Sequence, residues 1–148
     1  MCNYCGCREF PLIGQLTAEH EAIANAAGRL RTAINSGADN RIALLDDLLA
    51  LLMPHTEAEE RGLFLELRAE GTLTEAVEQL CDEHDDIHGV LSTVDRAAPD
   101  WSAVPAALDR LHRHIDNEEH GLFPAAVIAL PISAWDRLTP QQSAAQQA

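Results

Sequence analysis

Basic and aromatic residues are both scarce in this chain of 148 residues. Lysine and arginine together number 10 against 24 aspartates and glutamates, and the formal net charge is −14. A nucleic-acid-binding protein must neutralise phosphates with basic side chains, so this charge argues against nucleic acid as a partner. It argues equally against binding to an anionic membrane surface. Aromatic residues make up only 4% of the chain, which favours helices over a β-sandwich.

A long apolar run and a secretory leader are also missing. No segment reaches the roughly 18–20 apolar residues needed to cross a bilayer. The opening MCNYCGCREF has no basic stretch followed by an apolar one, so it does not match a signal peptide. We therefore expect one compact domain in the cytoplasm, where clustered cysteines more often bind metal or carry out redox chemistry than form structural disulfides.

Apolar residues recur at steps of three and four over four segments. This spacing predicts helices over roughly residues 11–36, 41–69, 73–97 and 104–130, and the inward face of the last helix should continue through Leu122 and Ala125. Short connections make sequential helices antiparallel, so the expected fold is all-α, an up-down-up-down four-helix bundle. Residues 1–10 are assigned to a Cys-rich N-terminal arm, 11–138 to the bundle and 139–148 to a flexible tail. Within the last stretch before that tail, Trp135 and Leu138 are candidates to pack back on the bundle.

An internal repeat divides the bundle into halves. The phrase HTEAEERGLF at His55–Phe64 returns as HIDNEEHGLF at His114–Phe123. A weaker match joins AEHEAI at Ala18–Ile23 to DEHDDI at Asp82–Ile87. The sequence therefore predicts two helical hairpins related by a pseudo-twofold axis.

Seven polar residues interrupt the apolar stripes where leucine would be expected. The depth of each polar residue can be counted from the nearest turn, at about 1.5 Å of helix per residue. For helices joined by a turn, the depths of their polar residues agree within roughly 3 Å. Burying such a set without partners would cost several kcal/mol, whereas divalent or trivalent cations would satisfy it. Mixed nitrogen and oxygen ligation inside a helical bundle favours iron first, then manganese or zinc. The candidate metal ligands are His20, His55, Glu59, His84, His88, His114 and Glu118.

Other polar residues near the candidate ligands are not expected to bind metal themselves. His112 and His120 face away from the inward stripe and are expected on the surface. Glu60 and Glu119 are expected to be solvated, with hydrogen bonding to a ligating imidazole as the alternative. A hydrogen-bonded core network without metal is the competing interpretation of all seven candidate ligands.

The order His … His-x3-Glu … His-x3-His … His-x3-Glu resembles the hemerythrin-like (HHE cation-binding) family over about residues 12–130. The resemblance implies a site of two iron ions that keeps one position open for a small ligand such as O2. It implies that His84, His88 and His114 hold one iron, that His20 and His55 hold the other, and that Glu59 and Glu118 bridge them together with an oxo or hydroxo group.

Two features qualify the resemblance. Invertebrate oxygen-carrying hemerythrins are similar except in the fourth helix, where an aspartate one residue further on bridges; Glu118 resembles the bacterial members, whose roles vary. Ile87 competes with His88 for the inward direction, so a four-histidine site, as in di-iron proteins linked to iron–sulfur repair, would leave His88 off the metal. The expected function is binding of O2 or a related small ligand for sensing, storage or delivery. The alternatives are a redox enzyme acting on peroxide or nitric oxide, and an iron-handling or stress-response protein.

The cysteines form a second unusual feature. Cys2, Cys5 and Cys7 precede the first helix, and Cys81 lies on the third helix one turn before His84. An extended arm can reach Cys81, so a four-cysteine site for zinc or iron is geometrically possible. A redox-active dithiol is a second interpretation. A disordered arm, with Cys81 as a small buried apolar residue, is the third, and the spacing leaves all three open.

Overall fold

All regular secondary structure in the computed structural model is helical. The model describes residue 6 and residues 9–138, and it has no strand within them. The predicted tail at 139–148 and most of the predicted arm, including Cys2, Cys5 and Cys7, lie outside the described residues. No helix in the described part of the chain is long and apolar enough to cross a membrane. The prediction of an all-helical fold is confirmed for these residues.

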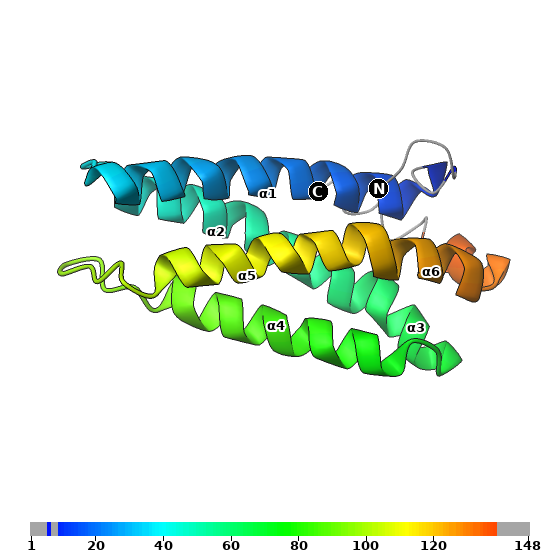
Figure 1. The fold of residues 1–148 in the computed structure, drawn as a ribbon. Coiled ribbons are helices and arrows are strands. Elements are labelled where there is room, and N and C mark those ends of the chain that lie inside the picture. The colour runs from blue at the N-terminus through cyan, green and yellow to red at the C-terminus, as the bar shows by residue number, and fades with distance from the viewer. Residues whose placement is uncertain (1–5, 7–8, 139–148) are drawn as a thin grey trace.

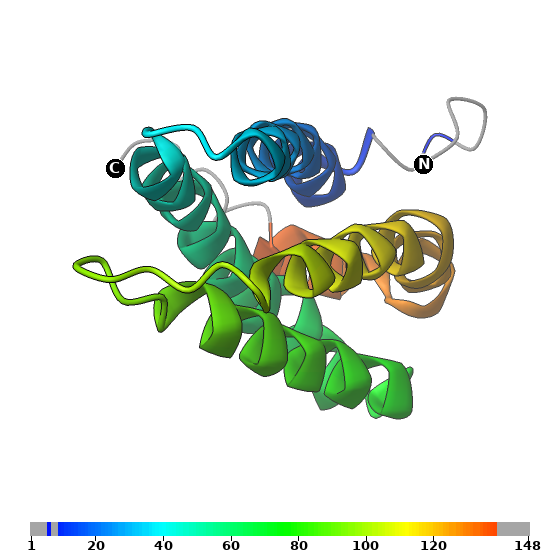
Figure 2. The same ribbon diagram turned by 60° about the vertical axis from the view of Figure 1, so that its left-hand side comes forward.

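Four long helical segments run alternately in opposite directions along the molecule (Figure 1). Turning the molecule shows α1 beside α2 and α4 beside α5, as the tertiary contacts require (Figure 2). A further short helix covers residues 132–138, so the predicted count of four helices is one too few for the part of the chain that the structure describes. The segments are α1 Pro11–Ser36; α2 Arg41–Ala58, continuing through the π-helical turn η2 Glu59–Leu63 into α3 Phe64–Glu70; α4 Thr74–Ser92; and α5 Val104–Asn117, continuing through η3 Glu118–Leu122 into α6 Phe123–Ala129.

Glycines end two of the long segments and set the short turns that follow. Gly37 has φ 67° and Gly71 has φ 66°, the left-handed conformation that glycine adopts at low cost. The next amides complete the caps, because Ala38 N–H donates to Ala33 O at 3.0 Å and Thr72 N–H donates to Leu67 O at 3.1 Å. These tight endings fold the second segment back on the first and the third back on the second.

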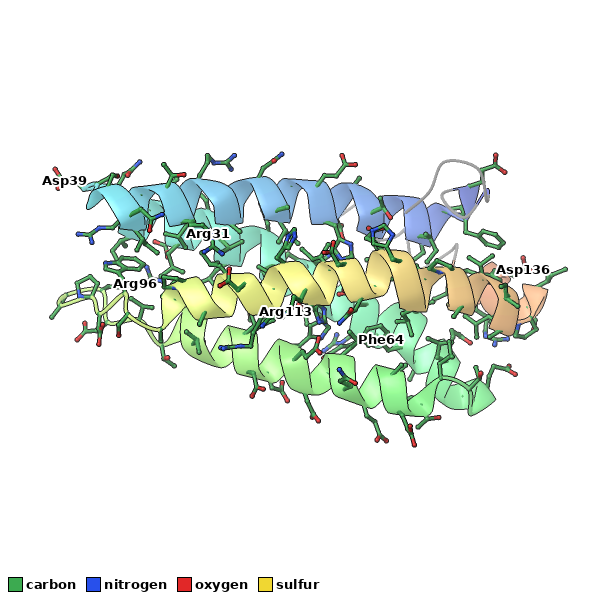
Figure 3. All side chains as sticks on the ribbon, viewed as in Figure 1. Arg31, Asp39, Phe64, Arg96, Arg113 and Asp136 are labelled. Carbon is green, nitrogen blue, oxygen red and sulfur yellow. The ribbon has the colours of Figure 1, made fainter. Side chains whose placement is uncertain are left out.

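The apolar core is divided into two clusters by a buried polar layer. One cluster packs the end that holds the 132–138 helix, and the other packs the end that holds the α1–α2 and α4–α5 connections. Phe64 points into the space between the helices, whereas Asp39 and Asp136 lie at opposite ends of the molecule (Figure 3). His20 sits between Leu16 of the first cluster and Ile23 of the second, so the polar layer crosses the middle of the bundle.

The π-helical turn η3 changes which residue faces inward after the polar layer in the last long segment. The turn adds one residue, so the inward face beyond it shifts by one position. Ala126 is fully buried where Ala125 was expected, and Ala125 is only partly buried. The prediction for Ala125 is therefore wrong, because a regular helical period was carried through a turn that is not regular.

The helix at 132–138 closes the end of the first apolar cluster. Trp135 is 8% exposed and Leu138 is 1% exposed, as expected for residues that pack back on the bundle. The rings of Phe10 and Trp135 lie 4.7 Å apart between centroids. Arg137 donates to both carboxylate oxygens of Glu66, with the shortest contact at 2.7 Å. This helix is thus part of the domain.

Trp135→Ala should lower the free energy of unfolding by about 3–5 kcal/mol, the usual cost of truncating a buried aromatic side chain. The matched control is Ile132→Ala in the same helix, since Ile132 is 80% exposed and should change stability by less than about 0.5 kcal/mol. Urea unfolding measures both. Equal stabilities for the two variants would show that the helix does not pack as described.

Candidate metal centre

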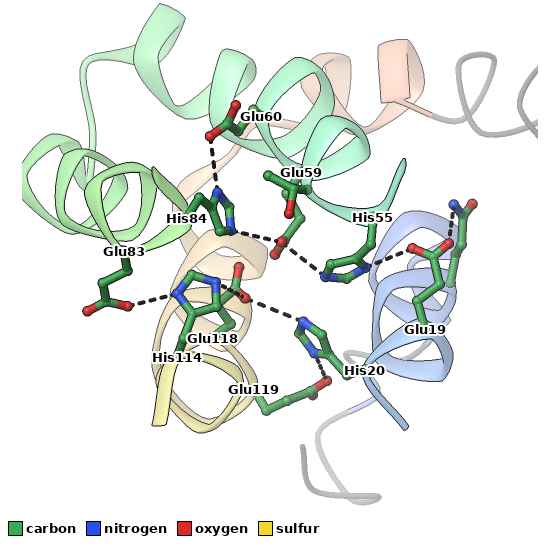
Figure 4. A network of polar contacts seen from close by, with 12 residues as sticks. Glu19, His20, His55, Glu59, Glu60, Glu83, His84, His114, Glu118 and Glu119 are labelled. Carbon is green, nitrogen blue, oxygen red and sulfur yellow. Dashed lines mark hydrogen bonds and ion pairs between the residues drawn. The ribbon is translucent and has the colours of Figure 1, made fainter. Parts of the chain in front are cut away.

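Six side chains from the four long segments bring nitrogen and oxygen atoms into one buried layer (Figure 4). These atoms form two overlapping groups, and within each group they lie within 4.8 Å of one another. All six residues are at most 4% exposed. Both groups contain both glutamates. The first group is His20, His55, Glu59 and Glu118, and the second is Glu59, His84, His114 and Glu118.

The inward-facing atoms of this layer have no partner in hydrogen-bond geometry. The histidine Nε2 atoms lie 2.9 to 3.4 Å from carboxylate oxygens, yet all four nitrogens and both oxygens of each glutamate are unsatisfied. Buried polar atoms are nearly always paired, and leaving them unpaired costs about 1–3 kcal/mol each. Cations between the imidazoles and the carboxylates would satisfy all of these atoms at once. The donor set therefore fits metal ions better than a hydrogen-bonded network.

The outward-facing nitrogen of each histidine contacts a separate glutamate. The Nδ1-to-oxygen distances are 2.7 Å for His20–Glu119, 2.9 Å for His55–Glu19, 3.0 Å for His84–Glu60 and 2.7 Å for His114–Glu83. A carboxylate at Nδ1 holds the proton on that nitrogen and presents the Nε2 lone pair to a metal. Four imidazoles are thus oriented with Nε2 toward the same centre.

The sequence pattern predicts only part of this outer ring of glutamates. The expectation of solvation is wrong for Glu119, which is buried, whereas the Glu60 side chain is 37% exposed. Both contact an imidazole, which was the alternative. Glu19 and Glu83 were missed. Their signal was present, because each stands directly before a histidine in the repeated Glu-His pair of the first and third helices.

Each copy of the phrase His-x3-Glu-Glu-x-Gly-Leu-Phe supplies a histidine and a glutamate to the centre and also forms a π-helical turn. The π-helical turn is closed by Phe64 N–H donating to Glu59 O, five residues back, and by Phe123 N–H donating to Glu118 O. Such turns occur often at functional sites. Here the turn lets the first glutamate face the centre while the second reaches an imidazole on a neighbouring helix.

The phenylalanine that ends each phrase packs flat on one of these imidazoles. Phe64 stacks on His84 with ring centroids 5.9 Å apart, and Phe123 stacks on His20 at 5.5 Å. Each ring thus buries the face of a histidine that the same phrase already holds through its second glutamate. Both halves of the molecule share this arrangement, so the two copies of the phrase act alike.

His88 stands apart from both groups of candidate ligands. Its Nε2 lies 3.0 Å from the Thr56 hydroxyl oxygen, and the ring is partly buried. In the repeat, His88 corresponds to Ala24 and Thr56 corresponds to Ile115, so one half has a polar pair where the other half has an apolar pair. This pair is the main difference between the halves beside the centre.

The remaining candidates lie outside the polar layer. His112 and His120 are exposed, as expected. Cys81 is partly buried, and its sulfur accepts a hydrogen bond from Arg68 at 3.3 Å. Burial, together with the charge of Glu60, raises the pKa of the Cys81 thiol, which keeps it protonated. Its proposed partners Cys2, Cys5 and Cys7 are outside the described residues, so the four-cysteine site stays a prediction.

Charge in the centre is balanced between imidazoles and carboxylates. Burial lowers the pKa of His55, but the adjacent Glu59 and Glu19 raise it on balance to about 10. Burial also lowers the pKa of His114, but the nearby Glu118, Glu59 and Glu83 raise it on balance to about 9. Burial and the charge of Glu59 raise the pKa of Glu118. The metal-free centre therefore carries protons at neutral pH.

Metal uptake at pH 7 should release at least one proton each from His55 and His114, because a bound Nε2 cannot keep its proton. Since both pKa values lie above 7, metal affinity should increase as the pH rises from 6 toward 9. Calorimetric titrations in buffers of different ionisation enthalpy count the released protons. Uptake of metal without proton release at pH 7 would contradict the charge assignment.

Comparison with known proteins agrees with this geometry. A sequence model described as the Hemerythrin HHE cation binding domain matches residues 12–126, a stretch that contains every member of the polar layer. No curated protein and no solved structure matches the chain. The match spans well over half of the sequence. The chain therefore belongs to the hemerythrin HHE cation-binding domain family.

Proposed function

We propose that this chain is a non-haem di-iron protein that binds O2 or a related small ligand for sensing, storage or delivery. The observation that carries the proposal is the pair of buried ligand groups that share Glu59 and Glu118. Two carboxylates common to two groups are what a carboxylate-bridged pair of ions requires. Imidazole nitrogen and carboxylate oxygen together suit iron, with manganese and zinc as the next choices.

The geometry supports four histidine ligands. In this assignment His20 and His55 would hold one ion, His84 and His114 would hold the other, and Glu59 and Glu118 would be shared by both. His88 is left off the metal because its Nε2 contacts Thr56 instead. This differs from the three-against-two arrangement that the family resemblance implies, and it matches the four-histidine alternative.

A small cavity adjoins the ligand layer on the side of the second apolar cluster. Its volume is about 10 Å³, close to the space that one water molecule occupies. The four candidate histidine ligands and Glu59 line it, together with apolar residues that include Ile23, Leu52 and Ile87. When bound, a pair of irons supplies reversible electron transfer and exchangeable positions for small molecules. The chain supplies an apolar wall that limits the ligand to a few atoms and excludes bulk water.

A redox enzyme acting on peroxide or nitric oxide is the second candidate. It is favoured by Thr56 and His88, which both line the same cavity and contact each other at 3.0 Å. A hydroxyl and an imidazole beside a small ligand can donate a hydrogen bond or a proton to it. Reduction of either ligand consumes protons, whereas simple O2 binding does not need this pair.

The test is an optical titration of the fully reduced, iron-loaded protein. Ligand binding predicts a visible absorption change on adding O2 that reverses when O2 is removed. Irreversible bleaching would contradict reversible carriage. Steady-state consumption of peroxide or nitric oxide, slowed in Thr56→Val and His88→Leu, would instead support the enzyme. Loss of iron to a chelator within minutes would favour an iron-handling role over both.

A further inference from the structure

Two surface grooves approach the small cavity from opposite sides of the molecule. One lies between α2 and α4, has a volume of about 470 Å³, and is lined by residues that include Thr56, Glu57, Glu60, His84, Asp85 and His88. The other lies between α1 and α5 and has a volume of about 390 Å³. The repeat makes them counterparts, because Thr56 and His88 correspond to Ile115 and Ala24, which line the second groove.

The inner ends of the two grooves differ in polarity. Thr56, His84 and His88 line both the α2–α4 groove and the cavity. His84 is 4% exposed and its Nε2, which faces the centre, has no hydrogen-bond partner. On the opposite side, Leu111 and Ile115 are the residues common to the groove and the cavity. The residues common to the first groove and the cavity are thus all polar, whereas those common to the second groove and the cavity are apolar.

The charge of the two grooves differs in the same sense. Glu57, Glu60 and Asp85 line the α2–α4 groove, where one cation, Arg61, is paired with Glu57 at 2.8 Å. Arg31, Asp109 and Arg113 line the other groove, so its charged residues carry a net positive charge. Arg31 lies between α1 and α5, where it contacts Asp109 at 2.6 Å (Figure 3). A cation is therefore attracted to the first groove and meets positive charge in the second.

We propose that the α2–α4 groove is the entry route by which divalent metal ions reach the centre. This inference rests on the proposed metal centre. Glu57 and Asp85 would concentrate hydrated cations at the mouth. Thr56 and His88 would replace water ligands in the narrow part, because a hydrated cation crosses an apolar barrier only at high cost. His84 and Glu59 would then receive the ion from the cavity side.

The test measures cobalt uptake by the metal-free full-length chain in a stopped-flow spectrometer, recording the rate and the final occupancy. The variant Thr56→Ile with His88→Ala copies the apolar pair of the opposite half. It should reach the same occupancy as the parent at a rate about tenfold lower, in the range by which electrostatic and polar guidance changes association rates.

A second variant, Glu57→Gln with Asp85→Asn, removes charge from two exposed side chains without disturbing the core. Uptake should slow by about tenfold at low ionic strength, and the difference should vanish near 1 M salt, where screening is nearly complete. The matched control is Glu21→Gln with Asp116→Asn, which changes the equivalent positions on the opposite face and should leave the rate unchanged.

The outcomes separate the two proposals. If the parent binds no cobalt, the proposed metal centre is wrong and the entry route with it. If the parent loads but all variants load at the parent rate, the centre stands and the entry route is wrong. If Thr56→Ile with His88→Ala loses final occupancy, His88 is a ligand and the route as proposed is refuted. Equal slowing by both charge variants would show a general charge effect and would also refute the route.

Discussion

Glu59→Ala is expected to leave the chain almost free of metal. Glu59 belongs to both buried ligand groups, so its removal takes an oxygen from each proposed ion and unbalances the positive charge that remains. Mutation of a residue that hydrogen-bonds to a metal ligand typically lowers metal affinity 10- to 100-fold. Loss of a ligand shared by both ions should lower the affinity by more than about 100-fold. Elemental analysis of purified protein, with circular dichroism to verify folding, measures the effect. Glu118→Ala should behave in the same way.

Two matched variants sharpen this prediction. Glu57→Ala removes a carboxylate two residues away that is exposed and paired with Arg61, and it should retain full occupancy. His20→Ala removes a ligand of only one group, so it should lose one ion more readily than the other. If Glu59→Ala keeps both metals, or if Glu57→Ala loses them equally, the assignment of Glu59 as a bridge is wrong.

Metal removal is expected to destabilise the domain without unfolding it. A ligand that binds only the native state stabilises it by about 4 kcal/mol when its free concentration is a thousand times Kd. For a chain of this length the melting temperature should fall by on the order of 10 °C. The two apolar clusters on either side of the centre remain packed, so the metal-free chain should keep its helical content. Thermal unfolding with and without chelator measures the difference.

The effect of pH on this difference has a definite sign. In the metal-free chain the pKa values of His55 and His114 are raised, to about 10 and about 9. Their protonated forms therefore contribute stability that is fully present below about pH 6.5 and is lost as the pH rises through 9 to 10. Metal replaces those protons, so metal-induced stabilisation should be larger at pH 9 than at pH 6. A larger effect at pH 6 would contradict this balance.

The sequence was sufficient to predict that six of the candidate side chains gather in one buried layer, because helical periodicity places residues by depth and face. His55 and Glu59, like His114 and Glu118, are four residues apart, and that spacing survives up to the π-helical turn. His20 and His84 were located by the same count along the first and third helices. The all-helical fold followed from apolar stripes whose breaks coincide with Gly37 and Gly71.

Other features depend on tertiary contacts or on irregular backbone that periodicity does not encode. The π-helical turn η3 displaced the inward face from Ala125 to Ala126. Glu19 and Glu83 look like surface residues on their own helices, and only the neighbouring helix supplies the imidazole that each contacts. The helix at residues 132–138 is too short to show a clear period. The His88 ring contacts Thr56 of another helix, and the spacing of residues along the sequence does not predict that contact.

The most direct test of the central claim is elemental analysis combined with Mössbauer spectroscopy of freshly purified protein. The two ligand groups that share Glu59 and Glu118 predict two iron ions per chain with magnetically coupled signals. Absence of iron, or one zinc ion alone, would contradict the proposed di-iron centre.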